Sequence, residues 1–303
     1  MAAIEGFTRR RVHLGEVTLS VQEGGRPEGP ALILLHGYPQ NGLCWSRVAP
    51  GLAERFRVIV PDLRGYGESD APADDAAHRT YSKRVMAGDV VRLMDVLGIA
   101  RAGILGHDRG GRVAYRLALD HPGRVARLGI IEIVPTAELW AAWSAELALK
   151  AYHWTFLAQP APLPERMIGA DPVAYVEHTL KSWTGAKSLE AFPPAALESY
   201  REQARDPARI AAMCADYRAG ATTDRAADEA DRAAGRRIAA PLRFLWAEGG
   251  FPGSTGDPAA IWRLWAGEVS DSACVSGHFV MEENPQAVLA AFLPFFAAAH
   301  GSG

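Results

Sequence analysis

The sequence predicts an α/β fold in which one mostly parallel, doubly wound sheet is interrupted by a helical insertion. Short, uniformly apolar runs alternate with helical patterns, which is typical of a parallel sheet covered by helices on both faces. The sheet-like runs stop near residue 134 and resume after residue 235. Of the 303 residues 49% are apolar, enough for a large domain with an insertion. We therefore predict a core domain formed by residues 1–134 and 236–303 and a helical cap, residues 135–235, rather than two tandem domains.

The predicted strands follow one another along the core. Residues 11–25, RVHLGEVTLSVQEGG, indicate an N-terminal hairpin because two apolar runs flank turn residues. Later runs are bounded by turn residues and are short enough for strands. They are ALILLHG, RVIVPDLRG, AGILGHD, RLGIIEIV, PLRFLWA and the shorter SACVSGH.

One helix of the core can be predicted together with its ends. Ser82 is a suitable N-cap and Gly98 a suitable residue just past the C-terminus. Between them, one helical face carries the apolar residues Met86, Val90, Leu93, Met94 and Leu97. A helix between two strands at this place agrees with a doubly wound sheet.

The insertion has a different composition. It is rich in Ala, Trp, Tyr and Pro, it has helical periodicity, and it contains no convincing strand. Its most charged run, TTDRAADEADRAAGRR (residues 222–237), is expected to be a solvated helix rather than a functional charge cluster.

Composition disfavours several classes of function. The net charge of −3, the pI near 6.3 and the lack of a basic block argue against nucleic-acid binding. Cys44, Cys214 and Cys274 are scattered, so we expect small buried side chains and neither a metal site nor a disulfide framework. The N-terminus lacks the apolar core of a signal peptide, and no apolar run approaches the ~20 residues of a membrane span. A soluble cytoplasmic protein without membrane partners is expected.

A candidate nucleophile lies at a strand-to-helix turn. Residues 106–110, Gly-His-Asp-Arg-Gly, fit the G-x-nucleophile-x-G elbow with Asp108 as nucleophile. The Arg109 backbone N–H would be one oxyanion donor, and the Tyr38 N–H in LLHGYP the second. His278, in SGHF, follows the last predicted strand. Asp108 alone would be taken for a helix cap, but these partners in this order favour an active site.

An aspartate nucleophile restricts the reaction type. Its unperturbed pKa is about 3.9, so it is ionised at neutral pH without a base to activate it. Attack on an acyl carbon would give an anhydride, whereas attack on a saturated carbon gives an ester that water can hydrolyse. His278 is therefore predicted to activate that water. The substrate should carry a halide or a strained epoxide on an sp3 carbon.

Two arginines follow the nucleophile within one helical turn. Arg109 and Arg112 are three residues apart and can face the same pocket. Two buried guanidiniums near one site require anions, and a substrate carboxylate could serve through bidentate hydrogen bonds. In the alternative, Arg112 lies on the helix without a role in the site, and Arg109 pairs with a carboxylate of the cap. We favour the substrate carboxylate.

The cap supplies polar-tipped aromatic residues. His153 and Trp154 are adjacent, and Tyr217 lies in a separate predicted helix. N–H and O–H donors of this kind can solvate a departing halide in an otherwise apolar pocket. Each residue taken singly is better explained by ordinary aromatic packing within the cap, and the residues alone do not decide in favour of a halide site for the three together.

The acid that orients His278 has two candidates. Glu132, in GIIEIVPT, ends one predicted strand, and Glu248, in FLWAEGG, ends the next. Either could instead be a surface carboxylate. We favour Glu132.

These motifs together resemble the haloacetate dehalogenases, most closely the fluoroacetate dehalogenase branch of the α/β-hydrolase superfamily. The likeness covers nearly the whole chain and includes HGYPQ, PDLRGYGESD, GHDRGGR, YHWTFLAQPAPLPE, CADYRAG and SGHF. It implies Asp108 as nucleophile, His278 as base, and a substrate carboxylate held by Arg109 and Arg112. It also implies a halide site formed by His153, Trp154 and Tyr217, a helical cap, a homodimer, and no cofactor or metal. Fluoroacetate dehalogenases carry aspartate where this chain has Glu132.

The expected reaction is therefore hydrolysis of a short 2-haloacid to a 2-hydroxy acid and halide, with water as cosubstrate. The nearest rival is an epoxide hydrolase, which needs acidic hydroxyls; Tyr152, Tyr200 and Tyr217 are candidates. A ligand receptor that retains the fold without catalysis is a rival of another class. The intact nucleophile, base and oxyanion elements argue against it.

Overall fold

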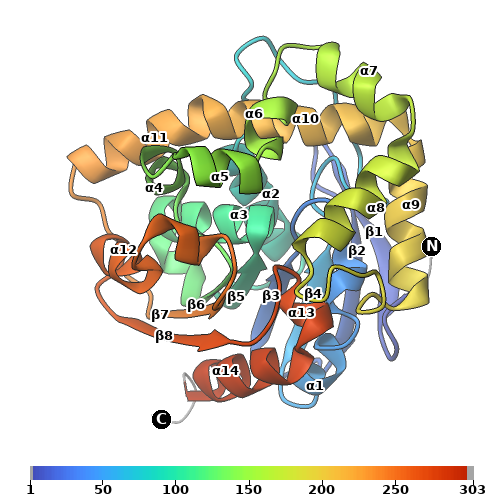
Figure 1. The fold of residues 1–303 in the computed structure, drawn as a ribbon. Coiled ribbons are helices and arrows are strands. Elements are labelled where there is room, and N and C mark those ends of the chain that lie inside the picture. The colour runs from blue at the N-terminus through green and yellow to red at the C-terminus, as the bar shows by residue number, and fades with distance from the viewer. Residues whose placement is uncertain (1–2, 299–303) are drawn as a thin grey trace.

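The computed structural model describes residues 3–298 and contains one eight-stranded sheet (Figure 1). The strand order is β1-β2-β4-β3-β5-β6-β7-β8. β2 pairs antiparallel with β1, its partner in the N-terminal hairpin, and also with β4. All the remaining pairs are parallel. The strands are β1 (Thr8–His13), β2 (Thr18–Gly25), β3 (Ala31–Leu35), β4 (Arg57–Pro61), β5 (Ala102–His107), β6 (Val125–Ile131), β7 (Leu242–Ala247) and β8 (Val269–Cys274).

The prediction of a mostly parallel sheet is confirmed, with two differences at strand ends. β6 ends at Ile131, because Glu132 adopts a left-handed conformation with φ of 61° that no regular strand permits. β8 begins at Val269 and ends at Cys274, earlier than the SACVSGH run suggests. His278 consequently lies in the loop that follows the edge strand.

Helices cover both faces of the sheet (Figure 1). On one face, α2 (Lys83–Val96) packs against α3 (Asp108–Asp120), and α12 (Pro258–Trp265) adjoins α3 through aromatic contacts. On the other face lie α1 (Ala49–Ala53) and α14 (Pro285–Ala297). The short α13 (Val280–Glu283) and the 3-10 helices η1 (Gly42–Trp45), η2 (Pro122–Arg124) and η3 (Pro252–Thr255) lie in connections.

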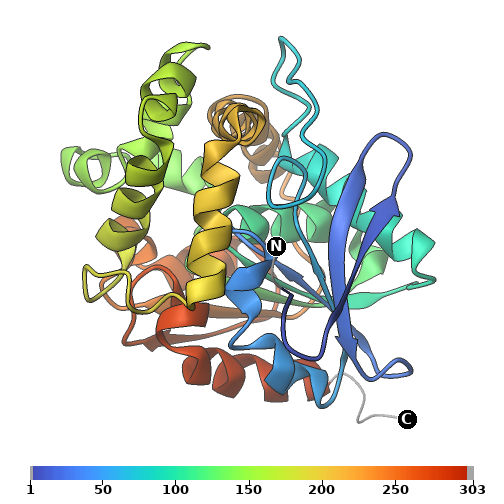
Figure 2. The ribbon, with the colours of Figure 1, turned by 90° about the vertical axis from the view of Figure 1, so that its right-hand side faces the viewer.

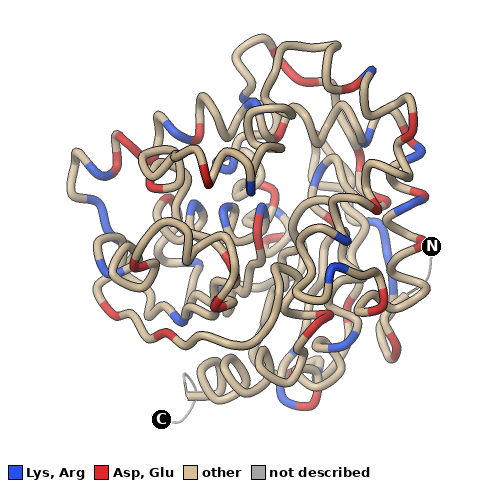
Figure 3. The backbone as a smooth tube through the Cα atoms, in the orientation of Figure 1, with Lys and Arg blue, Asp and Glu red and all other residues tan. Residues whose placement is uncertain are grey.

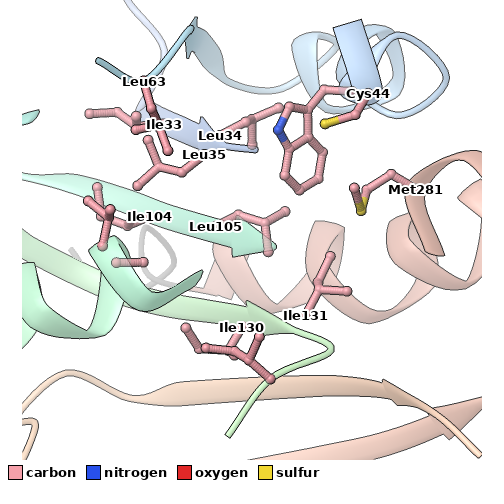
Figure 4. Packing of buried hydrophobic residues seen from close by; sticks show 14 of the residues in the cluster. Ile33, Leu34, Leu35, Cys44, Leu63, Ile104, Leu105, Ile130, Ile131 and Met281 are labelled. Carbon is pink, nitrogen blue, oxygen red and sulfur yellow. The ribbon is translucent and has the colours of Figure 1, made fainter. Parts of the chain in front are cut away.

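The predicted core helix matches α2. The Ser82 hydroxyl accepts a hydrogen bond from the Val85 N–H, and Gly98 has the left-handed φ of 68° that follows many helices. Met86, Val90, Leu93 and Met94 are all buried. Between the helical layers the central strands contribute a continuous apolar core, part of which is shown in Figure 4.

Helices alone occupy the chain between β6 and β7. They lie along the edge of the sheet where the parallel strands end (Figures 1 and 2). Within residues 3–298, no helix is both long and apolar enough to cross a membrane. The helices between these strands are α4 (Thr136–Ala141), α5 (Ala145–Lys150), α6 (His153–Leu157), α7 (Leu163–Gly169), α8 (Pro172–Trp183), α9 (Pro194–Arg205), α10 (Pro207–Ala221) and α11 (Thr223–Ala233).

Residues of both charges lie along α11 (Figure 3), but the expectation of a solvated helix there was wrong for one of its faces. Asp224, Asp228 and Asp231 are at most 5% exposed. Their spacing of four and three residues places them on the same helical face. That face meets core cations: Asp228 and Asp231 pair with Arg116, at 2.8 and 2.5 Å. These aspartates anchor the insertion to the core.

Candidate active site

The turn between β5 and α3 has the geometry of a nucleophile elbow. Asp108 is the first residue of α3 and has a φ of 48°, a conformation that is strained for a side chain other than glycine. The turn is tight enough that a Cβ atom at Gly110 would overlap the carbonyl oxygens of Leu35 and His36. Glycine at this position therefore lets α3 approach β3 closely, and Asp108 stands at the end of the sheet.

The carboxylate of Asp108 is bound on one oxygen and open on the other. The Tyr38 N–H donates to Oδ1 at 2.8 Å, while Oδ2 lies 3.8 Å from Nε2 of His278. Burial would raise the pKa of Asp108, but the neighbouring His278, His107 and Arg109 and the Tyr38 hydrogen bond lower it below its usual value. The carboxylate is thus ionised at neutral pH and has a backbone donor already in place.

His278 is held in position through its backbone. Its N–H donates to the Trp183 carbonyl at 2.9 Å, and its carbonyl lies 2.8 Å from Nε2 of His107. Rings of Trp183 and Phe251 lie 5.4 and 5.1 Å from its own ring. Burial lowers the pKa of His278 well below its usual value. The imidazole is therefore neutral and able to accept a proton.

Arg109 is paired with a carboxylate of the cap, which is the arrangement that the sequence analysis ranked second. Its guanidinium donates to the side chain and to the carbonyl of Asp216, on α10. Although burial opposes it, Asp216 raises the pKa of Arg109. Lys83 also pairs with Asp216, and Tyr66 donates its hydroxyl to the same carboxylate at 2.9 Å. Only Nη1 of Arg109 is left without a partner among the described residues.

Arg112 is a buried cation with neutral partners. Nη1 donates to the Val134 carbonyl and to the Thr136 hydroxyl, each at 3.0 Å, and the guanidinium lies 4.5 Å from the centre of the Trp154 ring. Among the described residues, Nε of Arg112 has no hydrogen-bond acceptor, and burial lowers the pKa of Arg112 although the charges of Asp108 and Asp228 act in the opposite direction. A buried guanidinium without a carboxylate bonded to it is costly, so this position favours an anionic ligand.

The three aromatic residues of the cap come together. The Tyr217 ring, on α10, lies 5.4 Å from the ring of His153 and 5.6 Å from that of Trp154, both on α6. Burial lowers the pKa of His153 to about 3 and raises that of Tyr217 well above its usual value. Both side chains are therefore neutral, and His153 Nδ1 and the Tyr217 hydroxyl have no partner within the described chain.

The two candidate acids differ sharply in environment. Glu132 is 1% exposed and borders the same cavity as His278. Its Oε2 accepts the Ala247 N–H at 2.7 Å, while its Oε1, like Nδ1 of His278, lacks a hydrogen-bond partner among residues 3–298. Glu248 is exposed. This contrast favours Glu132, although the structure contains no direct hydrogen bond between Glu132 and His278.

A small cavity borders Asp108 and His278. Its volume is about 20 Å³, which is room for about one water molecule. A buried polar atom without a protein partner is suited to hydrogen bonding with a substrate or with water. Several gather in and around this cavity, at Arg109 Nη1, Arg112 Nε, Glu132 Oε1, His153 Nδ1, Tyr217 Oη and both ring nitrogens of His278. The lining is formed by Asp108, Arg112, Glu132, Ile133, Val134, Leu139, Ala151, His153, Trp154, Trp183, Phe251, Pro252 and His278.

A larger open pocket, which we call the vestibule, adjoins the cavity. It has a volume of about 460 Å³ and shares Trp183, Phe251 and His278 with the cavity. Lys150 and Lys187 line it, and none of its lining residues is an aspartate or glutamate. The vestibule is thus a positively charged approach to the reaction centre.

Some residues of the site escaped the sequence analysis. Asp216 lies beside Tyr217 in the CADYRAG motif, so the need of Arg109 for an anion could have identified it. Lys83, in α2, gave no such signal because it lies in an otherwise ordinary amphipathic helix. Trp183 and Phe251 resemble any core aromatic in sequence. In the described chain, no group of three or more His, Cys, Asp or Glu side chains could hold a metal ion.

Comparison with known proteins identifies relatives along almost the full chain. A family model described as alpha/beta hydrolase fold matches residues 30–268. A fluoroacetate dehalogenase from Burkholderia sp. is 43% identical over 281 residues, covering 93% of this chain and 91% of the relative. A soluble epoxide hydrolase from Corynebacterium sp. (strain C12) is 33% identical, covering 89% and 91%. The solved structure of a putative epoxide hydrolase from Pseudomonas aeruginosa superposes with a TM-score of 0.91 at 45% identity, covering 99% and 98%.

Proposed function

Because this chain belongs to the α/β-hydrolase family, we propose that it is a hydrolytic dehalogenase of short 2-haloacids such as haloacetates. The observation that carries the proposal is Arg112, a buried guanidinium beside the nucleophile whose partners are all neutral. A substrate carboxylate would supply the missing anion. The unpaired Nη1 of Arg109 is a second donor for that carboxylate.

In the first step, a carboxylate oxygen of Asp108 attacks the α-carbon of the haloacid. An aspartyl ester forms, the carbon–halogen bond breaks, and the halide leaves with the bonding electrons. His153, Trp154 and Tyr217 stabilise the halide with N–H and O–H donors. Because His153 and Tyr217 are neutral, they solvate the leaving group without binding it as tightly as a cation would.

In the second step, His278 removes a proton from water, and the hydroxide attacks the carboxyl carbon of Asp108. Negative charge develops on Oδ1, where the Tyr38 N–H already donates at 2.8 Å. The Arg109 N–H is the second proposed donor. Collapse of this intermediate breaks the bond between the carboxyl carbon of Asp108 and the oxygen bound to the α-carbon. The departing alkoxide takes the proton from His278 and leaves as the 2-hydroxy acid, and Asp108 returns to its carboxylate form by losing a proton to water. Glu132 stabilises the imidazolium form of His278 during this step. The reaction requires no cofactor or metal, and we retain the homodimer as part of the proposal.

The decisive assay is halide release from fluoro-, chloro- and bromoacetate, with chloroacetamide as a neutral analogue of the same size. We expect release from at least one haloacetate and much slower release from the amide, since only the acid provides an anion for Arg112. Equal rates for acid and amide would contradict the role of the carboxylate.

The nucleophile can be tested by Asp108→Asn, an isosteric change. We expect loss of turnover because the amide is a poor nucleophile. Mass spectrometry of the intact wild-type protein during turnover should detect the substrate-derived ester, and the variant should lack it. Halide release at the wild-type rate in Asp108→Asn would refute the mechanism.

Epoxide hydrolysis is the second candidate, favoured by the unpaired hydroxyl of Tyr217 and by the epoxide hydrolase relative. It needs a proton donor for the opening alkoxide, and usually two tyrosines provide it. Here Tyr200 donates its hydroxyl to Glu282 at 2.9 Å, and Tyr152 lines the vestibule instead of the cavity. Diol formation from a small neutral epoxide, measured beside halide release, separates the two functions.

A further inference from the structure

Glu132 reaches from the end of β6 into the turn that follows β7. Its Oε2 accepts the N–H of Ala247, the last residue of β7. The turn is closed by a hydrogen bond from the Gly250 N–H to the Ala247 carbonyl at 2.9 Å. The carboxyl group therefore rests on this turn, and the position of the turn decides where Oε1 can lie.

Gly250 leaves the space that this carboxyl group fills. A Cβ atom at Gly250 would overlap Oε1 of Glu132 and would lie 2.7 Å from its Cδ and 2.9 Å from its Oε2. Glycine is not required there by backbone conformation, because Gly250 does not belong to the glycines with positive φ. The neighbouring Gly249 would have no atom within 4 Å of an added Cβ. The close contact is thus specific to position 250, and a side chain there would force the carboxyl group of Glu132 to move.

The same turn also contacts the base. Phe251, the next residue, places its ring 5.1 Å from the ring of His278 and lines the cavity together with Glu132. Lys150 donates to the carbonyls of Gly249 and Gly250, at 3.0 and 3.2 Å, which fixes the turn against the cap. A displacement of the turn would consequently move both the carboxyl group of Glu132 and the Phe251 ring that packs against His278.

We propose that Gly250 is a positioning residue for ester hydrolysis: by lacking a side chain, it lets the long arm of Glu132 place Oε1 toward His278. The inference rests on the proposed function and extends it. Glu132 and Gly250 then form a matched pair, in which the longer acid is accommodated only with glycine opposite. In Glu132→Asp the side chain is one methylene shorter, so its carboxyl group would lie farther from position 250 and leave room for a methyl group there.

The test compares Gly250→Ala with Gly249→Ala as the matched control, using chloroacetate. We expect Gly250→Ala to keep a burst of about one halide per active site but to turn over about 10- to 100-fold more slowly, since a displacement of about 1 Å can cost that much. The aspartyl ester should accumulate, as seen by mass spectrometry of the intact protein. Gly249→Ala should behave as wild type.

The pairing is tested by the double variant Glu132→Asp with Gly250→Ala, beside Glu132→Asp alone. The double variant should recover most of the hydrolysis rate that Gly250→Ala loses, and this rescue also serves if Gly250→Ala itself fails to fold. A double variant that is no faster than Gly250→Ala would overturn the inference, as would equal turnover in the two alanine variants. If wild type released no halide, the proposed function would fall as well.

Discussion

At the scale of single residues, Glu132 is a carboxyl group that ionises close to neutral pH. Burial raises its pKa to about 8, against the opposing hydrogen bond from Ala247 and the charge of Lys150. At pH 7 the group is mostly protonated, and only the carboxylate can stabilise the imidazolium of His278. The rate of ester hydrolysis should therefore depend on pH above neutrality.

We expect single-turnover hydrolysis of the aspartyl ester to accelerate from pH 7 to pH 9, with a midpoint near the pKa of about 8 of Glu132. Glu132→Gln should be slower and should lose this rise. Glu248→Gln, which changes the exposed acid at the neighbouring strand end, should keep both rate and profile. If the Glu248 variant alone lost the pH dependence, the assignment of the acid would be reversed.

The same group links stability to pH. Its folded pKa of about 8 lies above its ordinary value of 4.5, so between these values the folded chain keeps a proton that the unfolded chain has lost. The contribution of Glu132 to the free energy of unfolding should therefore fall as pH rises from about 4.5 to 8. Urea titrations of wild type and Glu132→Gln across this window should show a steeper decline in wild type, and parallel curves would contradict the buried, protonated state.

Residue types and spacing were sufficient to propose Asp108, His278 and Glu132, because elbow, base and strand-end acid follow one another in a fixed order along the chain. They were not sufficient for Arg109. Its partner Asp216 lies 107 residues away in the chain, and the sequence favoured a substrate carboxylate over a carboxylate of the cap as the partner of Arg109. Which of two arginines receives a protein carboxylate is decided by the packing of α10 on α3, which sequence does not specify.

At the scale of elements, α10 is attached to the core through a buried ion cluster. Asp216 faces Arg109 of α3 and Lys83 of α2, and Lys83 lies 3.9 Å from Asp224 of α11. The two cations lower the pKa of Asp216 even though burial alone would raise it. Four charged side chains thus join two core helices to two cap helices.

Asp216→Asn should destabilise the protein by about 3–5 kcal/mol, because it leaves buried cations without their carboxylate. Chemical denaturation followed by tryptophan fluorescence would measure the change. Glu229→Gln, which removes a surface pair on α11, should shift the free energy of unfolding by at most about 0.5 kcal/mol. If Asp216→Asn lowered the free energy of unfolding by no more than Glu229→Gln does, the ion cluster would contribute little net stability.

The buried face of helix α11 could not be recognised from its sequence. A search for apolar periodicity finds no buried face there, because the residues that face the core are aspartates. Their helical spacing was visible in the sequence, but the arginine and lysine that compensate them belong to α2 and α3. Burial of charge depends on partners from elsewhere in the fold, so it could not be predicted locally.

At the scale of the whole molecule, the vestibule places positive charge where an anionic substrate would enter, although the chain has a net charge of −3. Lys187 is exposed, and its ammonium group donates to the Ser182 carbonyl at 2.6 Å. A cation in such an opening raises the local concentration of anions, and salt screens the effect.

We expect Lys187→Gln to lower kcat/KM for chloroacetate by about two- to fivefold at low ionic strength, with the difference vanishing in high salt. The value of kcat should not change. Lys181→Gln, on α8 shortly before the loop that carries Lys187 and outside the vestibule, is the matched control. An effect that persists for chloroacetamide would show that the variant alters the pocket rather than steering.

The sheet and its interruption could be predicted because apolar runs of strand length are local signals. The vestibule could not, since its wall combines α5, α8 and the loops after β7 and β8, which meet only in the folded chain. The sequence therefore allowed a prediction of the chemistry at Asp108 but no prediction of the vestibule.

The contacts that hold the cap on the core also limit how substrate specificity could be changed by exchanging the cap. Besides the ion cluster, Gln203 of α9 accepts the Gly67 N–H at 2.6 Å and donates to the Pro39 carbonyl at 2.7 Å, next to Tyr38, the proposed oxyanion donor. A transplanted cap from a relative would bring its own halide donors but would meet foreign anchoring residues underneath. Chimeric designs should therefore transfer Lys83, Arg109 and Arg116 together with the cap, because the cap helices and these core residues depend on each other.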